Sequence, residues 1–459
     1  MTVSEFESDT STCADDGELA VDSTDAFSKT KLVYLVRRES LSSVFLSQVI
    51  RPMSLVAESG VDVEIAVLTP LGQIFRKPLR NRWADILAAV PTSLVGRVHR
   101  LPTPPSRMVW PWFEHMQLAR YLRRRTQPGQ LLIVQCRNST ATQLALHVKR
   151  WVPDIRVVFD CRGVLDHEFL YKHGVTYDSA PESLRNEAAK ITQEQQIAAV
   201  QSDAVFCVSE SMVCHLIQEC GIAKEKCVVV PCCVDVAHFA QASERRDEMR
   251  QRLGLDQRFV VTYCGSLASY QMPEESIELF CRIKRIEPKA HFLAITTQPI
   301  AMEAAVRAAE LSSQDATVVS VPHRQVAAYL AAADVGLLLR KRSPVNRVAS
   351  PVKFGEYLAS GTPVILSDEI GDYSKLAPLQ RVGMVLNSDW PEALVTQRLQ
   401  EFLQSYASST SEWRCRCQQT AHRHLDFANH LPKIRQTYGI RSNHCLQPTD
   451  HTLRCGNDL

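Results

Sequence analysis

Two consecutive sets of apolar strands that alternate with helices constrain the fold of this 459-residue chain more than any other feature. The first set spans residues 31–231 and the second spans residues 259–387. Strands that alternate with helices predict a parallel sheet with helices on both faces. We therefore expect an α/β protein of two doubly wound, Rossmann-like domains that face a cleft. Ligands of such sheets bind beyond the carboxyl ends of the strands, which places the predicted site in the cleft.

Formal charge is unevenly distributed along the chain. Residues 1–28 contain eight acidic residues and no Lys or Arg, a composition that predicts a disordered tail. The whole chain carries +2, so the remainder carries +10 once these eight negative charges are set aside. A mildly basic body suits a phosphorylated partner or a lipid surface, and a routine surface imbalance explains it equally well.

Cysteine usage and hydropathy indicate a cytoplasmic protein. The 15 cysteines are odd in number and include no Cys-x-x-Cys pair, which argues against a disulfide framework. There is no run of about 18 apolar residues that would span a membrane. The acidic N-terminus does not resemble a signal peptide. No Walker loop, zinc finger or RNA-recognition motif is present, so nucleic acid is not an expected partner.

The strongest local motif is SPVKFGEYLASGTPVI at residues 350–365, which predicts a helix, a glycine stop and a buried strand. Ser350 is a good N-cap and Pro351 suits the first helical position. A helix start binds anions through its free N–H groups and its dipole. Lys353 adds a cation there, and Glu356 follows one turn later on the same side. This arrangement suits a nucleotide, with phosphates at the helix start and ribose hydroxyls on Glu356. A capped surface helix with an ion pair is the alternative.

These residues resemble the sugar-nucleotide signature of GT-B glycosyltransferases, especially the large retaining family 4, or group 1. Other segments resemble the same family in the same order. They are the end of its first domain (203–210), its hinge (228–239), the glycine turn that opens its second domain (263–267) and the helix and strand before its donor site (329–339). The resemblance covers roughly residues 30 to 435.

The resemblance implies a division of the chain. It predicts a disordered acidic tail at 1–29, an acceptor-side Rossmann-like domain at 30–235, a nucleotide-sugar-binding Rossmann-like domain at 236–410, a C-terminal helix at 411–440 that returns to the first domain, and a loose tail at 441–459.

Three features depart from the family pattern. The first acid of the signature is expected eight residues before Glu356, where this chain has Val348. An Arg and a Lys that clamp the diphosphate are expected where Ser266 and Gln271 stand. The active-site His expected after the fifth strand is absent there, and His167 follows farther on.

Other cations are candidates to replace the missing clamp, because Arg binds phosphate through a bidentate fork. Arg340 ends a second-domain strand, and Arg162 follows a first-domain strand from which it could reach across the cleft. Solvated loops and local salt bridges are the alternatives. The predicted catalytic residues are Arg162, His167, Lys353 and Glu356. The predicted donor-binding residues are Gly265, Ser266, Arg340, Arg347, Ser350, Pro351, Val352, Lys353 and Glu356. We expect no metal and no cofactor, since helix N–H groups, Lys353 and Arg340 would absorb the leaving-group charge.

A cluster of aromatic and basic residues has two explanations. Trp110, Trp112 and Phe113 precede Arg120 and the run 123–125, a pattern typical of an element that lies on a membrane surface. A helix that packs its aromatic side chains inward and leaves its arginines solvated explains the pattern better.

Taken with the resemblance, these features imply a hexosyltransferase-like enzyme. It would move a sugar from a nucleotide-sugar donor to a hydroxyl of a glycan or lipid-linked acceptor, with retention, in polysaccharide or glycoconjugate biosynthesis. It would act in the cytoplasm, with a peripheral contact at the inner membrane surface as one option. A GT-B nucleotide-sugar epimerase or hydrolase is an alternative. So is a non-catalytic sugar-nucleotide-binding protein, which loss of the first acid and of the clamp favours.

Overall fold

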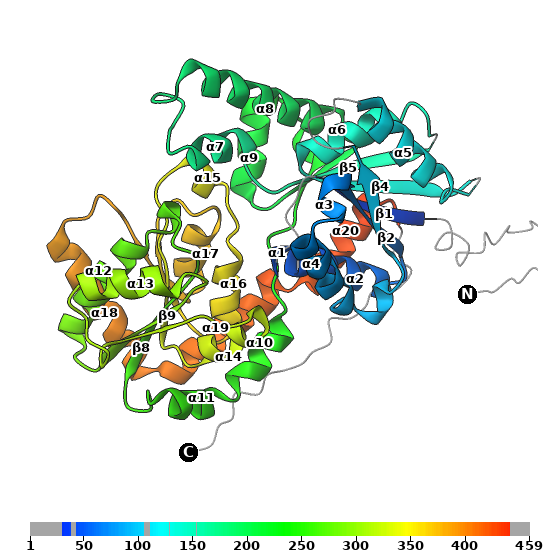
Figure 1. The fold of residues 1–459 in the computed structure, drawn as a ribbon. Coiled ribbons are helices and arrows are strands. Elements are labelled where there is room, and N and C mark those ends of the chain that lie inside the picture. The colour runs from blue at the N-terminus through cyan, green and yellow to red at the C-terminus, as the bar shows by residue number, and fades with distance from the viewer. Residues whose placement is uncertain (1–29, 38–42, 105–110, 128, 153, 441–459) are drawn as a thin grey trace, which may run out of the picture.

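The computed structural model describes residues 30–37, 43–104, 111–127, 129–152 and 154–440. The predicted tails at 1–29 and 441–459 lie outside these ranges. Two parallel sheets form two units, with the chain crossing between them (Figure 1). The predicted α/β fold class is confirmed. Within the described residues no helix combines the length and the apolar character needed to cross a bilayer.

The first sheet has seven strands in the order β3-β2-β1-β4-β5-β6-β7. Its strands are nearly continuous apolar runs, because helices bury both faces of a parallel sheet. The strands are β1 (Thr30–Arg37), β2 (Asp62–Pro70), β3 (Val98–Thr103), β4 (Leu131–Arg137), β5 (Ile155–Cys161), β6 (Ala204–Cys207) and β7 (Cys227–Val229). The helices are α1 (Ser43–Phe45), the π-helical η2 (Leu46–Ile50), α2 (Arg51–Glu58), α3 (Leu71–Ile74), α4 (Lys77–Ala88), η3 (Thr92–Leu94), α5 (Pro111–Arg123), α6 (Asn138–Val148), α7 (Leu165–Lys172), α8 (Glu182–Gln201), α9 (Glu210–Cys220) and η4 (Lys224–Lys226).

The second sheet has six strands in the order β10-β9-β8-β11-β12-β13. They are β8 (Phe259–Cys264), β9 (Ala290–Ile295), β10 (Ala316–Val319), β11 (Val335–Leu338), β12 (Val364–Ser367) and β13 (Gly383–Leu386). The helices are α10 (Val236–Ser243), α11 (Arg246–Leu253), η5 (Ser269–Gln271), α12 (Pro273–Ile286), α13 (Pro299–Ala308), α14 (His323–Ala331), α15 (Pro344–Arg347), α16 (Val352–Ala359), α17 (Tyr373–Leu379) and α18 (Glu392–Ser408). The strand order reverses between β8 and β11, and a crevice opens at such a switch point.

The C-terminal segment joins the two units. The stretch predicted as one helix is broken at Asp426 into α19 (Thr410–Leu425), which packs on α16, and η6 (Phe427–His430) with α20 (Leu431–Thr437). Phe427 and Tyr438 lie in the core of the first unit, and the Tyr438 hydroxyl donates to the Gln135 side chain of β4. The red end of the chain accordingly lies beside β1 and β2 in Figure 1.

Hydrogen bonds also join the two units opposite α19. The Asp372 carboxylate, at the start of α17, accepts from the backbone N–H groups of Glu210 (2.7 Å) and Ser211 (3.1 Å) at the start of α9. The Ser209 hydroxyl donates to the Val348 carbonyl at 2.7 Å. A helix start of the first unit is thus capped by an acid of the second.

Candidate active site

Helix α16 starts beside the hinge, and its cap differs from the one predicted. Pro351 is the N-cap residue and Val352 is the first helical residue, so Ser350 does not cap the helix. Instead the buried Ser350 hydroxyl accepts from the Cys232 backbone N–H at 2.9 Å and bonds the Tyr373 hydroxyl at 2.7 Å. Ser350 therefore fastens the hinge to the second unit. The predicted glycine stop is present, since Gly361 has a φ of +73°.

Lys353 and Glu356 form a buried ion pair on α16. Their side chains are 23% and 4% exposed. His323, at the start of α14, lies 4.0 Å from the second Glu356 oxygen. Burial lowers the pKa of Lys353, but neighbouring Cys264 and Glu356 raise it above its ordinary value. Lys353 is thus held as a cation at the end of β8 and the start of α16.

Arg340 is a second cation of the same unit, directly after β11. Its backbone N–H donates to the Ser367 hydroxyl at 2.9 Å, and its guanidinium lies 5.5 Å from the centre of the Tyr270 ring. Burial lowers the pKa of Arg340. Among the described residues it has no carboxylate partner, and its guanidinium donates to the Leu339 carbonyl at 3.3 Å. A desolvated cation without an anion is costly, so this one is well suited to an anionic ligand.

The two vacant clamp positions bond to each other. The Gln271 side chain donates to the Ser266 hydroxyl at 2.8 Å, and neither residue is charged. A Cβ atom at Gly265 would lie 2.2 Å from the Gln271 side-chain oxygen, so a larger residue there would displace that side chain. The predicted cations of this region are therefore Arg340, which follows β11, and Lys353, whose side chain lies by Cys264 at the end of the neighbouring strand β8.

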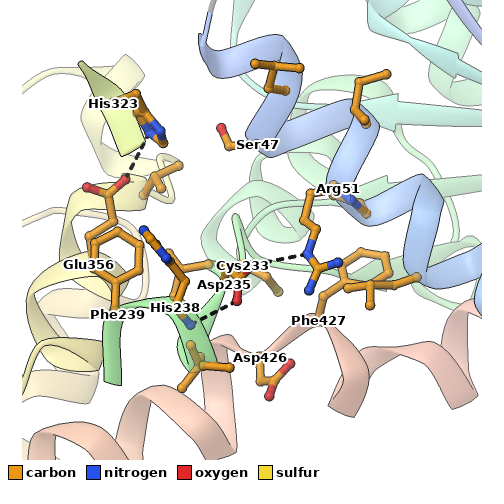
Figure 2. Close-up of a pocket in the computed structure, with 18 of the residues that line it drawn as sticks. Ser47, Arg51, Cys233, Asp235, His238, Phe239, His323, Glu356, Asp426 and Phe427 are labelled. Carbon is orange, nitrogen blue, oxygen red and sulfur yellow. Dashed lines mark hydrogen bonds and ion pairs between the residues drawn. The ribbon is translucent and has the colours of Figure 1, made fainter. Parts of the chain in front are cut away.

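A cavity of about 410 Å³ lies between the two units, next to the Lys353–Glu356 pair (Figure 2). Glu356 and His323 line one wall, while Ser47 and Arg51 of the first unit line the other. The hinge forms part of the lining, and its Asp235 pairs with Arg51 at 3.3 Å. Most other lining residues are apolar, as in small-molecule sites generally. Of the predicted donor-binding residues, Val352 and Glu356 line this cavity.

Three predicted residues lie away from the Lys353–Glu356 pair and make no contact with it. Arg162 is bonded at 2.8 Å to Asp160, a buried acid that also accepts from the Tyr34 hydroxyl. His167 packs against the ring of Tyr177. The structure therefore does not bring Arg162 or His167 to this pair. Arg347 is also separate from it, since its side chain is 62% exposed and pairs with Glu369.

The position of the missing first acid is part of the contact between the units. Val348 is buried in an apolar cluster with first-unit residues such as Phe159 and Met212. An acid at this position would be desolvated without a partner. His323 and Asp372 were missed by sequence reasoning, because no motif marks them and their partners lie on distant segments.

Within the described residues no group of three His, Cys, Asp or Glu side chains is arranged to hold a metal. Metal-free chemistry remains a prediction.

The first unit matches a family model, and the whole fold is similar to solved structures. Residues 55–238 match Glycosyltransferase Family 4. The fold is similar to those of HepE from Anabaena in complex with UDP (12% identity, TM-score 0.63, 89% of this chain and 99% of that one), starch synthase IV from Arabidopsis thaliana bound to ADP and acarbose (11%, 0.59, 89% and 98%) and WaaG, a glycosyltransferase involved in lipopolysaccharide biosynthesis (14%, 0.56, 90% and 100%). No curated protein sequence matches the chain. The chain has the GT-B fold, and the resemblance to family 4 glycosyltransferases is confirmed.

Proposed function

We propose that this protein transfers a sugar from a nucleotide-sugar donor to a hydroxyl of a glycan or lipid-linked acceptor. One observation carries the proposal: among the described residues the partly buried Arg340 has no carboxylate partner, and it follows β11, the neighbour of β8, whose end lies by Lys353. A cation after β11 and a cation in the first turn of α16 suit a diphosphate at that helix start. HepE has been crystallised with UDP-glucose, which supports the same class of donor.

In this proposal the diphosphate lies at the start of α16, between Arg340 and Lys353. Glu356 binds the ribose hydroxyls, and the nucleoside occupies the apolar part of the 410 Å³ cavity. When the anomeric C–O bond breaks, negative charge grows on the departing diphosphate. Arg340, Lys353 and the N–H groups of α16 stabilise that charge without a metal. Retention and a hexosyl donor are proposed from the family resemblance alone.

The acceptor is proposed by analogy. Starch synthase IV is bound to acarbose and WaaG is involved in lipopolysaccharide biosynthesis, so both a glycan and a lipid-linked glycan fit the family. A lipid-linked acceptor would place the reaction at a membrane surface.

Val348 favours a second candidate, a non-catalytic sugar-nucleotide-binding protein. It fills the position of the first acid with a buried side chain. A turnover assay separates the two functions. A transferase releases nucleoside diphosphate from a nucleotide sugar faster when acceptor is added, and the label enters the acceptor. Binding of the diphosphate without any turnover supports the second candidate, and acceptor-independent release supports a hydrolase.

A further inference from the structure

Helices α4 and α5 flank the outermost strand of the first unit, β3. The Arg100 guanidinium of β3 lies 5.1 Å from the centre of the Trp83 ring on α4. Its neighbour His99 contacts the ring of Tyr121 on α5. Successive residues of a strand point to opposite faces, so α4 and α5 cover the two faces at this edge.

Exposed apolar and cationic side chains lie together on the α3–α4 side of this edge. Phe75 is 79% exposed and Leu71 is 40% exposed. Exposed cations follow at once: Arg76, Lys77, Arg80 and Arg82. Within the described residues none of these cations forms an ion pair, and α4 contains one acid, Asp85. Each is free to meet an anion outside the protein.

The α5 side has the same character. Trp112 and Met116 are 54% and 49% exposed, and Trp151 beside them is 45% exposed. Together with Arg120, Arg123 and Arg124 they line a surface groove of about 660 Å³. The exposure of Trp112 contradicts the inward packing that we expected from the sequence. Trp110 lies outside the described residues.

Phe75 and Trp112, the first exposed aromatic side chain of each set, lie near the carboxyl ends of the strands, which form the cleft-facing edge of the sheet. Helix α3 follows β2 directly, so Phe75 comes just after a strand's carboxyl end. Glu114, in the first turn of α5, pairs with Arg37 at the carboxyl end of β1. The carboxyl ends of parallel strands share one edge, and in this fold that edge faces the cleft.

We propose that the β3 edge of the first unit, covered by the exposed side chains of α3, α4 and α5, docks on an anionic lipid bilayer. Phe75 and Trp112 enter the interfacial region, and the arginines and Lys77 meet the headgroups. A soluble polyanion would engage the cations but leave both aromatic side chains in water, whereas a bilayer engages both kinds. Docking would present the cleft to the membrane that holds a lipid-linked acceptor. The surface does not include the donor site, so the two proposals fail independently.

Vesicle co-sedimentation of the full chain tests the proposal. We expect binding to vesicles of phosphatidylcholine with phosphatidylglycerol, weak binding to phosphatidylcholine alone, and weakening by salt. R76A/R80A should weaken binding roughly thirtyfold, since each cation near an anionic surface contributes about 1 kcal/mol. F75S/W112S should weaken binding at unchanged salt dependence. The matched controls are R285A/K289A and I300S on the second unit, where these residues are also exposed.

Each outcome is decisive. Loss in the edge variants with retention in the controls supports docking, provided that circular dichroism shows all variants folded. Equal loss in the controls would mean general charge attraction and would overturn the proposal. Absence of vesicle binding, or binding only to a soluble anionic glycan, would overturn it as well.

Discussion

Glu356→Gln should separate the phosphate and ribose parts of the proposed site. The substitution keeps the shape of a side chain that is 4% exposed but removes the anion that pairs with Lys353. Removing one partner of a buried pair costs about 3–5 kcal/mol of unfolding free energy. Lys353 keeps 23% of its side-chain exposure, so we expect the low end, about 3 kcal/mol.

The same variant should bind pyrophosphate more tightly than the wild type does. In the wild type, Glu356 competes with any phosphate for Lys353. In the variant, the glutamine that replaces Glu356 carries no charge, so a bound phosphate becomes the anionic partner of Lys353. A charge-assisted hydrogen bond contributes about 1.5–3 kcal/mol, so affinity should rise between about tenfold and about a hundredfold. A nucleoside diphosphate should gain less than pyrophosphate, since it also loses its ribose partner.

Isothermal titration calorimetry of both ligands measures this difference. Glu369→Gln is the matched control, since Glu369 pairs with the exposed Arg347. Lys353→Met combined with Glu356→Gln should recover much of the lost stability, because it leaves no buried charge unpaired. If Glu356→Gln weakens pyrophosphate and the nucleotide equally, or changes neither, Lys353 is not a phosphate ligand and the reasoning is refuted.

Three further predictions concern other parts of the chain. Arg340→Ala should weaken diphosphate binding by about 1.5–3 kcal/mol in calorimetry and lower turnover still more. Arg342→Ala is the control and should change neither, since Arg342 forms an exposed ion pair with Asp368. Equal effects of the two variants would contradict the assignment of Arg340. Asp372→Ala leaves the N-cap Ser209 but removes the acceptor of the first two N–H groups of α9, so about 1 kcal/mol of interface stability should be lost and limited proteolysis should accelerate. Unchanged proteolysis would contradict the role of this contact. Burial lowers the pKa of His430 from 6.5 to about 4. Between these two pH values the unfolded chain binds a proton and the folded chain does not, so the free energy of unfolding should fall by about 2 kcal/mol from pH 7 to pH 5. The urea midpoint of a His430→Gln variant should lack this pH-dependent loss.

Local pattern was sufficient to predict the fold class. Apolar strands and the helices between them repeat with periods that the sequence displays directly. The glycine stop of α16 and the ion pair of Lys353 with Glu356 are also local, since three residues separate the pair on one helix.

Site residues that depend on distant partners could not be predicted in the same way. Ser350 has the preferred side chain of an N-cap, but its partner is the Cys232 backbone of the hinge. Arg162 follows a strand end as a site residue would, yet Asp160 holds it. Asp160 is in turn bonded by Tyr34, two strands away in the sheet order, and one sequence does not reveal that proximity.

The central claim is that the start of α16, with Arg340 and Lys353, binds the diphosphate of a nucleotide. Calorimetric titration of the wild-type protein with UDP, ADP and GDP, each beside its bare nucleoside, tests it most directly. We predict that at least one diphosphate binds at least tenfold more tightly than its nucleoside, and that this difference disappears in Arg340→Ala. Equal affinity of every diphosphate and its nucleoside would contradict the account.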